Sequence, residues 1–75
     1  MIPPEISKLA AEHLTDKQRS VFFWHLRDGI PLRRIAIMLD FTHSTTQDSF
    51  DGACRALRKQ GVKFTKDGRP YKENA

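Results

Sequence analysis

The chain has 75 residues, a single cysteine, and 13 lysines and arginines against 9 aspartates and glutamates. A chain of this length forms one small domain near the lower limit of independent folding, which excludes an enzyme with a large enclosed pocket. The positive charge is concentrated near one end, because residues 1–51 hold 6 basic and 7 acidic side chains whereas residues 52–75 hold 7 basic and 2 acidic ones. Such a basic end favours binding to a polyanion.

Two helices are predicted in the first part of the chain. Two prolines, which the first turn of a helix tolerates, open an amphipathic helix over residues 4–13. The next helix is predicted over residues 16–28, with Thr15 as its N-cap, Gln18 as its capping-box partner and Gly29 as its stop. Apolar side chains crowd most sides of this second helix, so we expect it to be largely buried. These side chains are Val21, Phe22, Phe23, Trp24 and Leu26.

Two further helices are predicted over residues 32–39 and 44–59. The shorter one begins after Pro31 and carries apolar residues at three- and four-residue steps, which gives it one apolar face. Thr42 or Ser44 can cap the longer one. Its predicted inward stripe consists of Thr46, Phe50, Ala53, Cys54 and Leu57.

The remainder of the chain, residues 62–75, is predicted to be a basic tail that follows a helix-turn-helix domain over residues 1–61. Asp67 and Gly68 in this tail are typical of a two-residue hairpin turn, and the same composition suits a flexible arm. The sequence therefore predicts an all-α fold, a bundle of three to four helices with an extended or hairpin C-terminal tail.

Two short helices joined by about three residues, with polar side chains on the first turns of the second, are typical of a helix-turn-helix. A pattern of small and apolar residues runs through this part of the chain: Leu14-Thr15, Gly29-Ile30-Pro31, Ile35-Ala36, Leu39, Phe41-Thr42, Ala53 and Leu57. This pattern resembles the helix-turn-helix of region 4 of bacterial sigma factors and of LuxR-type regulators. The chain departs from these families at Pro31, Arg34 and Asp40, where they often have Ser or Thr, an acidic residue and Gly.

The resemblance implies that the first turns of the fourth helix contact base edges in the major groove. The positions concerned are His43, Ser44, Gln47 and Asp48. Gln47 has the clearest chemistry, because its amide can pair bidentately with adenine. Asp48 and Asp51 put negative charge on the same helix and repel phosphate, and the alternative interpretation is that all these side chains are simply solvated.

Basic side chains on either side of this helix are candidates for phosphate contacts. Arg33 and Arg34 begin the preceding helix, and Arg55, Arg58 and Lys59 occupy the later turns of the fourth. In the tail, Lys63, Lys66 and Arg69 are candidates for minor-groove or further backbone contacts. A solvated charged surface is the alternative for each group.

The sequence thus predicts a sequence-specific regulator of transcription that binds double-stranded DNA and has no enzymatic activity. One alternative is a protein-interaction module that binds RNA polymerase or another regulator. Another is the DNA-recognition domain of a phage packaging small subunit, because Leu14-Thr15-Asp16-Lys17-Gln18 also resembles the start of that helix-turn-helix. A homodimer is a further partner considered for this chain, because binding to a single DNA half-site gives little affinity.

No cofactor or metal is predicted. His13, His25, His43 and Cys54 offer no zinc spacing, and Cys54 is expected to pack as a small apolar residue. There is no apolar run long enough to span a bilayer and no basic and apolar leader, so we expect a cytoplasmic, nucleoid-associated protein without a membrane partner.

Overall fold

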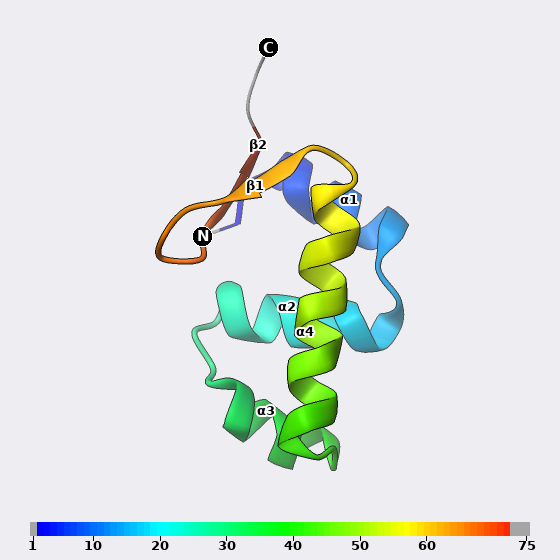
Figure 1. Ribbon diagram of the computed structural model, residues 1–75, viewed down its shortest axis with the longest axis vertical. Helices are drawn as coiled ribbons and strands as arrows, with labels where there is room; N and C mark the ends of the chain where they lie inside the picture. Colours follow the sequence, from blue (N-terminus) through cyan, green and yellow to red (C-terminus); the bar gives the residue numbers. More distant parts are fainter. Residues whose placement is uncertain (1, 73–75) are drawn as a thin grey trace.

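The computed structural model describes residues 2–72, which form four helices and a two-stranded hairpin (Figure 1). The elements in chain order are α1 (Pro4–His13), α2 (Asp16–Leu26), α3 (Leu32–Leu39), α4 (His43–Arg58), β1 (Val62–Phe64) and β2 (Pro70–Lys72). The mostly helical bundle predicted from the sequence is confirmed. None of the helices in this part of the chain is long and apolar enough to cross a membrane.

The local signals at the start of α2 act as predicted. The hydroxyl of Thr15 accepts from the backbone N–H of Gln18, and the side chain of Gln18 accepts from the N–H of Thr15, both at 3.1 Å. The capping box is therefore confirmed. The helix ends at Leu26 rather than at residue 28, because the chain turns through Gly29, which has a positive φ of 71°.

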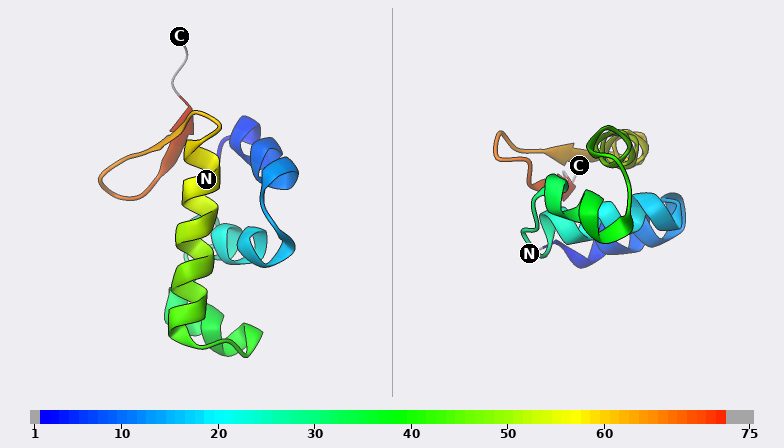
Figure 2. Two further views of the ribbon diagram at one scale, coloured as in Figure 1. Left: turned by 45° about the vertical axis from the view of Figure 1, so that its right-hand side comes forward. Right: turned by 90° about the horizontal axis from the view of Figure 1, so that it is seen from below.

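Helix α4 forms the axis of the molecule, and the other elements gather along it (Figures 1 and 2). α3 lies at its N-terminal end and the hairpin at its C-terminal end, while α1 and α2 cover one side. The result is an elongated shape with extents of 40 × 22 × 17 Å. One helix thus connects two regions that lie far apart in space.

The core runs along the inner face of α4 and includes residues from several parts of the described chain. Its main cluster consists of Ile2, Ile6, Ala10, Leu14, Phe22, Ala53, Cys54, Leu57 and Val62, and Val21, Ile35 and Ala36 are buried as well. Only Val21 and Phe22 of α2 are buried, and Trp24 is half-buried. The expectation that α2 is largely buried holds only in part, because Phe23 and Leu26 pack against the core but stay partly exposed.

The end of the described chain folds as a hairpin. Strands β1 and β2 pair antiparallel, with Val62 opposite Lys72 and Phe64 opposite Pro70. The turn is longer than the predicted two residues: the N–H of Thr65 donates to the carbonyl of Arg69 at 2.9 Å, which leaves residues 66–68 as the loop. Val62 is only 2% exposed and belongs to the core, so the hairpin is packed onto the helices.

Candidate nucleic-acid interface

A tight turn joins α3 to α4. Asp40 adopts the left-handed conformation, with φ 56° and ψ 41°, and the N–H of Phe41 donates to the carbonyl of Ala36 at 2.8 Å. This pairing is the Schellman end of a helix, in which glycine usually occupies the left-handed position. Lys17 of α2 places its ammonium 4.6 Å from the centre of the Phe41 ring, which ties the turn to the neighbouring helix.

Thr42 fixes the start of α4. Its hydroxyl accepts from the backbone N–H of Thr45 at 3.0 Å, and its carbonyl accepts from the hydroxyl of Thr46 at 3.0 Å. Thr46 is completely buried, so this second hydrogen bond satisfies a polar group inside the core. The helix therefore begins at His43, one residue before the predicted start, and it ends at Arg58 instead of residue 59.

The outward face of α4 changes charge along its length. This face consists of exposed side chains spaced three and four residues apart, namely Ser44, Asp48, Asp51, Arg55 and Arg58. Its middle is acidic and its C-terminal part is basic. The first turn, with the exposed His43 and Ser44, carries no acidic side chain, so it does not repel phosphate as the acidic middle does.

Gln47 is less available than the sequence predicted. Its side chain is half-buried, and its Nε2 atom donates to Oδ1 of Asp51 at 3.1 Å. An amide held in this way would have to leave Asp51 to pair with a base, or would use only its remaining donor and its carbonyl oxygen. Asp48, one position further along, is exposed on the outward face.

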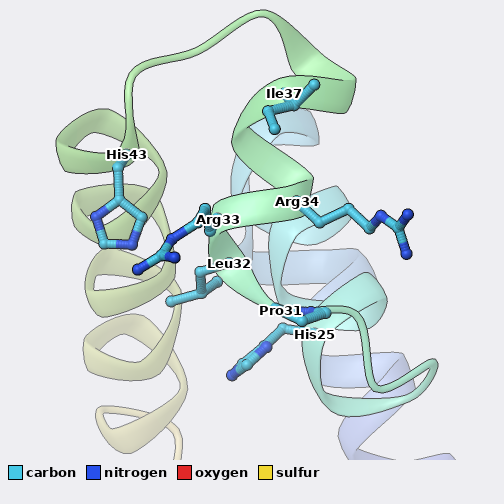
Figure 3. Close-up of a pocket in the computed structure, with 7 residues that line it drawn as sticks. All are labelled: His25, Pro31, Leu32, Arg33, Arg34, Ile37 and His43. Carbon is cyan, nitrogen blue, oxygen red and sulfur yellow. The ribbon is translucent and has the colours of Figure 1, made fainter.

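A shallow groove of about 610 Å³ lies between α3 and the start of α4. It is lined by His25, Pro31, Leu32, Arg33, Arg34, Ile37 and His43. Figure 3 shows Arg33 extending from α3 towards His43, while Arg34 extends to the other side of α3. Among the residues that the structure describes, no aspartate or glutamate lines the groove. Its electrostatic character is therefore positive, over an apolar floor.

His25 is held in place at the lower end of this groove. Its Nδ1 lies 2.8 Å from the carbonyl oxygen of Ile30, and since a carbonyl only accepts, Nδ1 must carry the proton. Its ring also meets the ring of Phe50 edge-on, with centroids 5.0 Å apart. These contacts fix the imidazole and leave its Nε2 atom as the acceptor when the ring is neutral.

The arginines of α3 differ from those in and next to α2 in their electrostatic partners. Arg19 and Arg27 form ion pairs with Asp16 and Asp28, and the contact with Asp28 raises the pKa of Arg27. Within residues 2–72, Arg33 and Arg34 form no ion pair, and both are exposed. Their charge is available to an external anion.

The remaining predicted phosphate contacts lie at the other end of α4. The guanidinium of Arg58 stacks 5.1 Å from the ring centre of Phe64 on β1, next to the exposed Lys59. In the hairpin, Lys63, Lys66 and Arg69 are exposed, and the backbone N–H of Arg69 donates to the hydroxyl of Thr65 at 3.0 Å. The predicted residues thus form two groups, one around the groove and one around the hairpin.

Two features of the groove were not predicted. His25 gave no signal, because its role depends on a contact across the loop to α3. Ile37 was missed although a signal was present: six of the eight residues of α3 are apolar, which is more than one helix face can bury. Ile37 is in fact 77% exposed.

No protein-family model matches the chain, and no curated protein and no solved structure matches it either. Among the residues that the structure describes, no three histidine, cysteine or acidic side chains gather as a metal site would require.

Proposed function

We propose that the protein is a sequence-specific regulator that binds double-stranded DNA through α3 and α4, used as a helix-turn-helix. One observation carries the proposal: Arg33 and Arg34, which have no ion-pair partner within residues 2–72, share a groove with His43, in an exposed first turn of α4 that has no acidic side chain and follows α3 after a three-residue turn. In such a motif the second helix enters the major groove by its first residues, while the first helix rests on the backbone.

In this proposal the side chains divide into two tasks. His43, Ser44 and Asp48 present donors and acceptors to base edges, and Asp48 accepts from the amino group of cytosine. Gln47 contributes after it releases Asp51, or with its carbonyl oxygen. Arg33 and Arg34 contact phosphates, which set the register of the helix on the duplex but do not read sequence.

The second cationic group extends the proposed interface. Because β1 follows α4 after a short turn, Lys66 and Arg69 belong to a folded hairpin rather than to a free arm. Together with Arg55, Arg58 and Lys59, they would engage backbone phosphates beside the major groove, or the adjoining minor groove. The acidic Asp48 and Asp51 between the two groups oppose non-specific binding and so favour specificity.

The experiment is a site selection from random duplexes, followed by titration of the best site and of a random duplex at several salt concentrations. The double variant Arg33→Gln/Arg34→Gln should bind both duplexes more weakly. The slope of log affinity against log salt concentration should become shallower by about 0.9 for each phosphate that is no longer neutralised. His43→Ala should weaken the free energy of binding to the selected site by about 1–3 kcal/mol and change binding to the random duplex little.

Lys8→Gln is the matched control, since Lys8 is an exposed cation on α1, far from α3. It removes one positive charge without touching the proposed interface, so its salt slope should stay at the parent value. If Lys8→Gln lowered the slope as much per charge as the α3 variant, binding would reflect net charge alone. If no duplex were enriched in the selection, the proposal of sequence-specific binding would be wrong.

A further inference from the structure

The apolar part of the groove is not explained by contacts with DNA. Ile37 is 77% exposed, and it shares the groove with Leu32 and Pro31. A phosphate backbone would satisfy Arg33 and Arg34 but would leave Ile37 against a hydrated, charged surface. Apolar side chains gathered in a groove with a charged rim are instead typical of a surface that another protein covers.

The charge around the groove restricts which protein segment fits. Two arginines and two histidines line it, and within residues 2–72 no carboxylate lines it or pairs with the arginines. A partner with carboxylates beside an apolar anchor would satisfy both parts of the groove, because arginine pairs strongly with carboxylate.

A second copy of this chain fits less well. If two copies met symmetrically through the groove, each would present the same cationic lining, and neither groove would supply a carboxylate to the arginines of the other. Juxtaposed like charges of this kind disfavour a complex. The complementarity therefore points to a different protein.

We propose that the groove between α3 and α4 docks an amphipathic helical segment of a partner protein, with aliphatic residues on one face and glutamates or aspartates along its edges. The aliphatic face covers Ile37 and Leu32, and the carboxylates pair with Arg33 and Arg34. This is the helix-in-groove mode of recognition, in which anchors repeat at three- and four-residue steps. Docking does not depend on DNA binding, but where both occur they compete for the same two arginines.

The test uses a synthetic fluorescent peptide of about 15 residues, long enough to form a helix on binding. It carries leucines at three- and four-residue steps and glutamates on the flanks, and its control carries lysines in place of the glutamates. Fluorescence anisotropy with the full chain, in the absence of DNA, should show saturable binding of the glutamate peptide and at least about tenfold weaker binding of the lysine peptide. No binding, or equal binding of both peptides, would overturn the proposal.

Two variants locate the site. Ile37→Ser should lower the affinity for the glutamate peptide about tenfold or more, since it removes the exposed anchor. Met38→Ser is the matched control, because Met38 is 50% exposed on the same helix but does not line the groove, and it should bind like the parent. Equal effects of the two variants would overturn the assignment of the groove.

The two proposals can fail separately. Ile37→Ser should leave affinity for the selected duplex unchanged, whereas the Arg33→Gln/Arg34→Gln variant should bind both peptide and duplex more weakly. A parallel weakening of duplex and peptide binding in Ile37→Ser would make the groove part of the DNA surface and overturn the docking proposal. If the protein bound the peptide but no duplex, the docking proposal would be supported, and only the proposed DNA-binding function would be contradicted.

Discussion

Gln18 on α2 lies against Gly52 on α4, so close that a Cβ atom at position 52 would come within 2.9 Å of the Nε2 atom of Gln18. The carbonyl oxygen of the same side chain accepts from the N–H of Thr15 and closes the capping box of α2. One amide therefore caps its own helix and fills the space against the next. The glycine, unfavourable in a helix, makes room for it.

This relationship predicts energetic coupling between the two positions. Gly52→Ala gains about 1 kcal/mol of helix propensity but displaces Gln18 and weakens a cap of similar value, so its net effect on stability should be small. In a Gln18→Ala background the same change should stabilise by about 1 kcal/mol. Urea unfolding of the four proteins of this cycle measures the coupling. The same gain in both backgrounds would mean that Gln18 moves aside at no cost.

A second prediction concerns the turn between α3 and α4. Asp40 holds a left-handed conformation that costs a residue with a side chain up to about 1–2 kcal/mol and glycine almost nothing. Asp40→Gly should therefore raise stability by up to about 1 kcal/mol, equivalent to about 4–8 °C in Tm. Asp40→Ala, which retains the Cβ atom, is the control and should give no such gain. A lower Tm for Asp40→Gly would show that the carboxylate itself stabilises the turn.

A third prediction concerns the hairpin as part of the core. Val62→Ala should destabilise by about 2 kcal/mol, because it removes two buried methyl groups and leaves a small cavity. Lys66→Ala in the exposed loop is the matched control and should unfold like the parent. A chain that ends after Gly61 should lose cooperative unfolding in a thermal melt. A sharp, unshifted melt of that shortened chain would contradict the packing of Val62.

A fourth prediction uses the buried thiol. Burial raises the pKa of Cys54 from 9.0 to about 11, so the folded protein holds the unreactive thiol form at neutral pH. A thiol reagent at about pH 8 should label Cys54 no faster than the protein opens, and urea should accelerate labelling steeply. Immediate labelling of the native protein would show that α4 opens locally. Cys54→Ala provides the blank for the reagent.

The same thiol predicts the direction of a pH effect. The unfolded chain loses the thiol proton near its ordinary pKa of 9.0, while the folded chain keeps it until about pH 11. Because the folded state then binds more protons than the unfolded state, stability should fall as the pH rises between these two pKa values. Cys54→Ala should lack this part of the decline. An identical decline in both proteins would assign it to other groups.

Local signals in the sequence were sufficient to predict where the helices lie. They did not predict where each helix ends or which of its side chains are exposed. Thr15 and Gln18 act over a few residues, so their capping box could be read directly. The end of α2 depends on how the chain turns at Gly29 towards α3, which no local pattern specifies. The half-burial of Trp24 likewise depends on which face of α2 meets α4, a matter of tertiary packing.

The candidate site was predictable only in part for the same reason. Polar residues on the first turns of α4 and basic residues at the start of α3 follow from the pattern of the motif. That Gln47 is bound to Asp51, and that His25 joins Arg33 and His43 in one groove, follows from side-chain placement across three elements. Exposure of Ile37 could have been inferred from the excess of apolar residues in α3.

The elongated shape limits how much of a duplex a single copy can occupy. With a longest extent of 40 Å, one molecule placed along B-form DNA covers little more than one helical turn of about 34 Å. A nuclease footprint of one copy would then protect about 10 base pairs on one side of the helix. Longer protection would require neighbouring copies or a bound partner, so footprint length reports directly on how many proteins occupy the site.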